Sequence, residues 1–199
     1  MKISWRLLAI LLVTASIFLV SCGDEGIGST SDDSDTTATS KEDAEDKNDS
    51  ALSMKAAEKD AQFLVDVVAS NYGEVKLAKL GQQRSSHKDL KGVAKLLEAD
   101  HTAVLNDLKS LASTKSIVIP TEESPDAKDK LKELGADKAS EFDKEWCEML
   151  MDSHKTSITR FENAANDISD ADIKNFVNTV LPKLRTHHDK LMECHKKLK

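Results

Sequence analysis

The feature that most constrains this chain is a hydrophobic repeat of three to four residues, which continues from Ser53 almost to the C-terminus. Such spacing places apolar side chains along one face of a helix, whereas a half-buried strand would alternate them every second residue. Gly and Pro, which interrupt helices, occur only seven and three times in the 199 residues. We therefore predict an all-α fold, in which each helix buries one apolar stripe against the others.

The repeat divides into four long predicted helices, at about 55–83, 87–114, 137–167 and 170–198. The first two are joined by a short connection, as are the last two, so each pair is expected to form an antiparallel hairpin. The connection between the hairpins, 115–136, can cross the length of a bundle and contains a short helical stretch near 126–134. Two hairpins with one long crossover are typical of ferritin-like four-helix bundles.

The N-terminal segment 1–22 has the pattern of a signal peptide. The basic residues Lys2 and Arg6 precede an apolar run, Leu7–Val20, which is too short to span a membrane comfortably. The run ends in the letters LVSC, which resemble a bacterial lipobox, whose cysteine is lipidated and becomes N-terminal. This resemblance implies a lipid anchor on Cys22 and a location in the bacterial cell envelope, at the outer membrane or on the periplasmic side. The alternative is an uncleaved membrane anchor with an incidental cysteine.

Residues 23–52 differ sharply from the rest of the chain in composition. They contain no aromatic residue and carry ten acidic residues against two lysines. Such a segment buries too little apolar surface to offset its ordering entropy, so we predict a disordered acidic tether in front of a bundle domain at 53–199. The tether is more negative than the whole chain, whose net charge is −7, because the basic residues Lys2 and Arg6 offset part of it; the domain is left nearly neutral. Because no basic excess remains, nucleic-acid binding is not expected.

Several short stretches of the predicted domain resemble one bacterial family. They are FLVDVVASNYGEVKLAKLG at 63–81, the pair Asp100-His101, His154, and LPKLRTH at 181–187. Their order and spacing are similar to the ferritin-like family labelled domain of unknown function 4142, often described as outer-membrane proteins, over about residues 56–198. The resemblance implies a ferritin-like bundle. It implies no activity, because the family has none that is settled.

A candidate metal site arises from histidines within the apolar stripes. Three of the predicted helices carry one each, namely His101, His154 and His187. At 1.5 Å of rise per residue, the three positions lie at nearly the same level of the bundle. Three acidic residues fall near that level: Glu74, Glu98 and Asp100. Imidazole and carboxylate ligands suit Zn, Fe, Mn or Cu, so we predict that these side chains can converge on a transition metal.

Two interpretations of the histidines stay open. Glu98 and His101 have the Glu-x-x-His spacing of di-iron bundles, but neither of the other two histidines has a glutamate three residues before it. A di-iron oxidase is therefore not expected. The histidines can form a mononuclear, histidine-rich metal site, or they can be packed in the core with hydrogen bonds to Asp100, Asn71 or one another.

The two cysteines of the domain, Cys147 and Cys194, are predicted to face each other. Facing residues of an antiparallel helix pair share one sum of residue numbers, and this pair has the same sum as His154 and His187. An oxidising envelope compartment would allow a disulfide between the two helices. The alternatives are two buried free thiols or ligands for a soft metal.

The motifs of known enzymes are incomplete in this sequence. We identify no nucleophilic triad, no phosphate-binding loop and no catalytic residue, so an enzyme is the less favoured interpretation. The expected function is a non-enzymatic binding or structural module of the envelope, acting on an unidentified envelope protein or cell-wall partner. The alternative is a metal-binding or storage protein that uses the histidine level.

Overall fold

The computed structural model describes residues 37–38, 40–51 and 55–198, which are mostly helical. The predicted signal peptide, Cys22 and the first part of the predicted tether lie outside these residues. Among the described helices, none combines the length and apolar character needed to cross a membrane.

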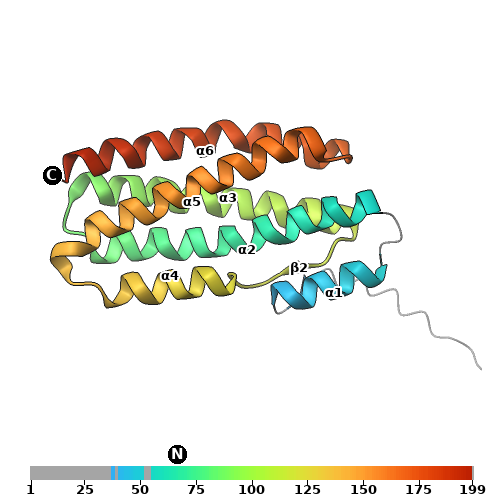
Figure 1. Cartoon of the computed structure of the whole chain (residues 1–199), viewed down its shortest axis with the longest axis horizontal. Coiled ribbons are helices and arrows are strands. Elements are labelled where there is room, and N and C mark those ends of the chain that lie inside the picture. The colour runs from blue at the N-terminus through green and yellow to red at the C-terminus, as the bar shows by residue number, and fades with distance from the viewer. Residues whose placement is uncertain (1–36, 39, 52–54, 199) are drawn as a thin grey trace, which may run out of the picture. The chain divides into compact units, whose positions relative to one another are not determined.

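Four long helices form the bundle: α2 (Lys55–Arg84), α3 (Lys88–Lys115), α5 (Ala139–Asp167) and α6 (Ala171–Lys197). Helices α2 and α3 make one antiparallel hairpin, and α5 and α6 make the other (Figure 1). The hairpins meet where α3 packs on α6 and where α2 packs on α5. The predicted all-α bundle is therefore confirmed, with helix ends within two residues of those expected.

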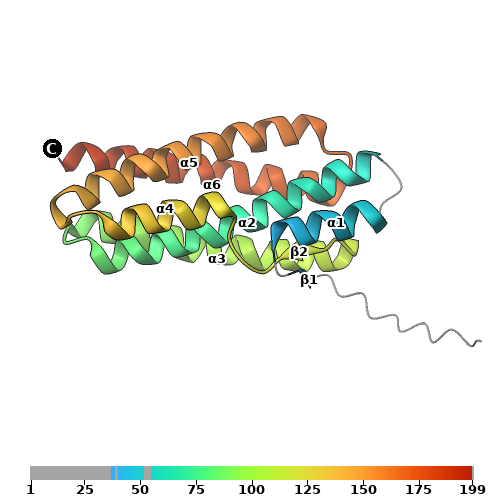
Figure 2. The same cartoon turned by 60° about the horizontal axis from the view of Figure 1, so that its bottom comes forward.

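The predicted crossover contains a short strand, β2 (Ile119–Pro120), and a helix, α4 (Pro125–Ala136). Ser124 caps α4 by accepting a hydrogen bond from the backbone of Ala127, and proline occupies the first turn, where its missing N–H costs nothing. Helix α4 lies along α2 (Figure 2). The two helices approach so closely that a Cβ on Gly73 would lie 2.6 Å from that of Ala127.

The structure corrects the boundary of the predicted tether 23–52. Its last residues form helix α1 (Lys41–Ala51), which packs against α2 and β2. A two-residue strand before it, β1 (Thr37–Ala38), pairs in parallel with β2. The bundle domain therefore begins before the predicted residue 53.

Contacts with distant residues stabilise α1 despite its polar composition. The side-chain amide of Asn48 donates to the carbonyl of Val118 and accepts from its N–H, both at 2.8 Å. Ala44 is fully buried and packs in a small apolar cluster with Val65. Because these partners lie far away in sequence, the composition of the segment alone does not reveal them.

The apolar core is divided by the histidines. One cluster lies near the loop between α5 and α6 and includes Leu64, Leu108 and Phe161. The other lies toward the opposite end and includes Leu97, Leu150 and Leu191. Along α3, α5 and α6, each histidine stands between a residue of one cluster and a residue of the other. A polar layer therefore crosses an otherwise apolar core.

Candidate metal centre

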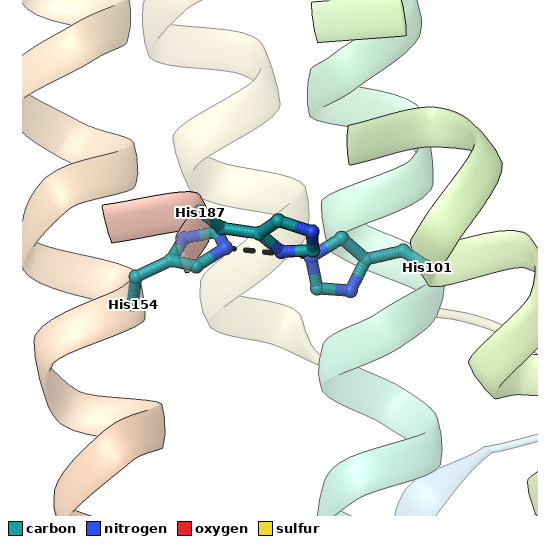
Figure 3. A group of neighbouring side chains, drawn as sticks. All are labelled: His101, His154 and His187. Carbon is teal, nitrogen blue, oxygen red and sulfur yellow. Dashed lines mark hydrogen bonds between the residues drawn. The ribbon is translucent and has the colours of Figure 1, made fainter. Parts of the chain in front are cut away.

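The predicted histidines converge at mid-bundle. His101 from α3, His154 from α5 and His187 from α6 are all buried, with 5%, 1% and 3% of their surface exposed. Their ring centroids lie 5.3–5.5 Å apart in all three pairs. One ligand atom from each ring lies within 4.8 Å of the others (Figure 3). The predicted three-histidine level is therefore confirmed.

The hydrogen bonds of Asn71 determine the protonation of His101. The side-chain nitrogen of Asn71 donates to the carbonyl of Val67 at 2.9 Å, so its Oδ1 is an acceptor. This oxygen lies 2.9 Å from Nδ1 of His101. Nδ1 of His101 therefore carries the proton in the neutral ring, and Nε2 presents a lone pair.

The other two imidazoles are oriented in the same manner. Nδ1 of His154 donates to the backbone carbonyl of Leu150 at 2.9 Å, which leaves Nε2 unprotonated. Nε2 of His187 donates to the Asp100 carboxylate at 2.8 Å, which leaves Nδ1 unprotonated. This Nδ1 is buried and has no hydrogen-bond partner in the described part of the chain. Each ring therefore donates through one nitrogen and keeps a lone pair on the other.

The spacing of two ring nitrogens at the centre, those of His101 and His154, matches that of two ligands of one metal ion. Nε2 of His101 and Nε2 of His154 are 3.4 Å apart, the contact drawn as a dashed hydrogen bond in Figure 3, but neither nitrogen carries a proton for it when both rings are neutral. Two nitrogens bound at 2.0–2.1 Å to one tetrahedral ion are separated by about 3.3 Å. The three rings donate hydrogen bonds to Asn71, Leu150 and Asp100. Hydrogen bonds of this kind orient histidine ligands in metal sites.

Burial favours the neutral, metal-binding form of two of the rings, His101 and His187. Burial lowers the pKa of His101 well below its usual range, and the neighbouring rings of His154 and His187 lower it further. Burial also lowers the pKa of His187, although its hydrogen bond to Asp100 acts in the opposite direction. Neutral rings at neutral pH need not lose a proton before they coordinate an ion.

Glu74 of α2 lies beside the histidines but is not one of the three converging groups. It is 6% exposed, and its Oε2 has no hydrogen-bond partner within the described residues. Burial raises the pKa of this carboxyl, whereas His154, Lys130 and a hydrogen bond from Ser153 lower it. Glu74 also lines a cavity together with His101 and His187. Its predicted position near the histidine level is confirmed, and its role as a ligand stays a prediction.

The other two predicted acidic ligands have different positions. Glu98 accepts a hydrogen bond from Gln82 at 2.6 Å and pairs with Lys79 at 3.7 Å, on the partly exposed side of α3. It is absent from the group of converging ligands, so the Glu-x-x-His motif does not assemble here. The Asp100 carboxylate accepts a hydrogen bond from Nε2 of His187, the ring nitrogen that points away from the other histidines. Asp100 is therefore an orienting group rather than a member of the central set.

The predicted pairing of the cysteines in space is confirmed. Cys147 and Cys194 are both buried and their side chains interact, so burial and the neighbouring Cys194 together raise the pKa of Cys147. Both are free thiols in the structure, so the predicted disulfide is not formed in it.

Comparison with known sequences assigns the domain to a protein family. The sequence model of a family described as "Domain of unknown function (DUF4142)" matches residues 44–193. The match begins within α1 and ends within α6, so it includes most of α1 as well as the bundle. No curated protein and no solved structure matches the chain.

Proposed function

This chain belongs to the DUF4142 family, and we propose that its bundle binds one transition-metal ion through His101, His154 and His187. The observation that carries the proposal is the set of three buried rings, each with one nitrogen within 4.8 Å of the others. The hydrogen bonds to Asn71, Leu150 and Asp100 leave the other nitrogen of each neutral ring free to bind an ion. Without a cation, two of these lone pairs face each other at 3.4 Å in an apolar core. A bound ion would remove that repulsion.

The ligand set favours particular metals. Three neutral imidazoles with no carboxylate among them suit Zn²⁺ or copper, whereas Mn²⁺ prefers oxygen ligands. We therefore propose Zn²⁺ or copper rather than Mn²⁺, and a single ion rather than a di-iron pair. One ion in a buried polar layer is a binding site and not a mineral store.

Metal analysis of the protein purified without an affinity tag tests the proposal. We expect close to one equivalent of Zn²⁺ after loading, and less than about a hundredth of the wild-type affinity in His101→Ala and in His154→Ala, because each removes one of three ligands. His188→Ala is the matched control, since that ring lies outside the central set. Binding below about 0.1 equivalent in the wild-type protein would overturn the proposal.

We further propose that lipid on Cys22 anchors the domain to a membrane of the bacterial envelope, where it acts on an envelope protein or cell-wall partner without catalysis. The support is the sequence of residues 1–22 alone. A Cys22→Ala variant expressed in bacteria tests the anchor, because it should move from the membrane fraction to the soluble fraction. Incorporation of labelled fatty acid that persists in this variant would contradict the proposed anchor.

A further inference from the structure

A small cavity lies against the histidine level. Its polar side is formed by Asn71, Glu74, His101 and His187, and its apolar side includes Phe161. The volume is about 20 Å³, which is enough for one water molecule. Two of the three proposed ligands therefore border a space that can hold a water next to the metal.

A surface groove of about 470 Å³ adjoins this cavity. The groove is lined by residues of α1, α2, α4 and α5, and it shares four lining residues with the cavity: Ser70, Glu74, Ser157 and Arg160. These four residues therefore border both the histidine level and the surface groove. Two of them, Ser70 and Ser157, are serines with small side chains.

The chemistry of the walls indicates what the cavity would accept. Glu74 contributes a buried carboxylate oxygen without a partner in the described part of the chain, and a metal-bound water would donate to it. Arg160 and Lys183 also line the cavity and bring positive charge to it. Three histidine ligands with a fourth position left to water are the pattern of exchangeable zinc sites, whereas structural sites are closed by four protein ligands.

We propose that the metal ion keeps its fourth coordination position open toward this cavity, and that water and small anions exchange there by way of the groove. This inference rests on the proposed three-histidine site. Glu74 is a positioning residue that accepts a hydrogen bond from the metal-bound water. Ser70 and Ser157 form the passage, and Arg160 attracts the incoming anion.

Azide titration of the Co²⁺-loaded protein, followed by visible absorption, tests the inference. We expect one bound Co²⁺ and a saturable spectral change on addition of azide, because the anion replaces the water. A spectrum that azide does not change, with Co²⁺ fully bound, would overturn the open position and leave the metal site intact. Failure of Co²⁺ to bind would overturn the three-histidine site and this inference with it.

One pair of variants tests the role of Glu74 in the cavity wall. Glu74→Gln should bind azide about tenfold more tightly, because it removes a negative charge beside the anion, whereas the matched Glu98→Gln should not change azide affinity. If Glu74→Gln instead loses Co²⁺ or changes the spectrum before azide is added, Glu74 is itself the fourth ligand and the inference is wrong.

The passage is tested by the rate of azide binding. Ser157→Leu narrows the shared wall and should slow azide binding, whereas Thr159→Leu, on an exposed position of the same helix, should not. An equal rate in Ser157→Leu and the wild-type protein would contradict the proposed route.

Discussion

The two layers that α5 and α6 build, one of histidines and one of cysteines, lie two helical turns apart but differ in chemistry. His154 and His187 meet His101 from a third helix, and the outer nitrogen of each ring has an oxygen acceptor. Cys147 and Cys194 meet each other within an apolar cluster and are free thiols. The helix repeat of α5 and α6 brings both pairs together. The histidine pair differs because neighbouring residues supply a third imidazole and hydrogen-bond acceptors, as a metal site requires.

The largest expected difference between the layers is in the stability conferred by metal. At free Zn²⁺ a thousandfold above its Kd, binding should raise the free energy of unfolding by about 4 kcal/mol. Thermal unfolding with Zn²⁺ and with a chelator measures the effect. Cys147→Ala should keep the whole metal-dependent increase, whereas His154→Ala should lose it. If Cys147→Ala lost the Zn²⁺-dependent stabilisation, the ion would be bound in the cysteine layer and the proposed histidine site would be contradicted.

The acceptors behind the rings should have the next largest effect. Asp100→Asn keeps the shape of the side chain but removes the charge that orients His187, so Zn²⁺ affinity should fall by about 10- to 100-fold. Competition with a chromophoric chelator measures the affinity. Glu98→Gln makes the same type of change on the same helix, away from the rings, and should leave the affinity unchanged. Equal losses in both variants would contradict the orienting role of Asp100.

Acid should destabilise the metal-free protein through the histidine layer. The pKa of His101 is lowered by burial, so the unfolded chain binds more protons than the folded chain below the unfolded pKa of about 6.5. The contribution of His101 to stability is therefore full above that pH, and it falls by up to about 1.4 kcal/mol per pH unit as the pH decreases through it. Urea unfolding of wild type and His101→Gln between pH 5 and pH 8, a range of about three units around that pKa, measures the slope. A slope that His101→Gln leaves unchanged would contradict this assignment.

The smallest effect is expected in the cysteine layer, where only the reactivity of the two thiols should differ between the folded and the unfolded protein. Burial raises the pKa of both thiols, so few thiolates exist at neutral pH and a thiol reagent should react slowly with the folded protein. Denaturation should speed the reaction by more than about tenfold. Rapid modification of the folded protein would show that the layer opens toward solvent. Purification under oxidising conditions, followed by thiol counting in denaturant, tests whether the predicted disulfide forms.

The sequence predicts the histidine layer because it depends on regular features. Helical repeats determine which residues face the core, and short connections determine which helices are antiparallel neighbours. Together they suffice to place His101, His154 and His187 at one level. The backbone acceptor for His154 follows a recognisable i−4 spacing to Leu150, so this hydrogen bond could have been inferred as well.

Features that depend on single side-chain contacts could not be predicted in the same way. The spacing of Glu98 and His101 does not reveal that Gln82 and Lys79 bind the carboxylate on the outer side of α3. The order in α1 depends on Asn48 and a backbone partner 70 residues away. The cavity beside Glu74 arises from side-chain packing among several helices, for which a linear repeat provides no information.

The most direct test of the central claim is X-ray absorption spectroscopy at the metal edge of the Zn²⁺-loaded protein. We expect three imidazole nitrogens and one lighter oxygen or nitrogen ligand at about 2.0–2.1 Å, with no sulfur in the coordination sphere. Sulfur scattering at about 2.3 Å, or a shell of oxygens without imidazole, would contradict a metal site built from His101, His154 and His187.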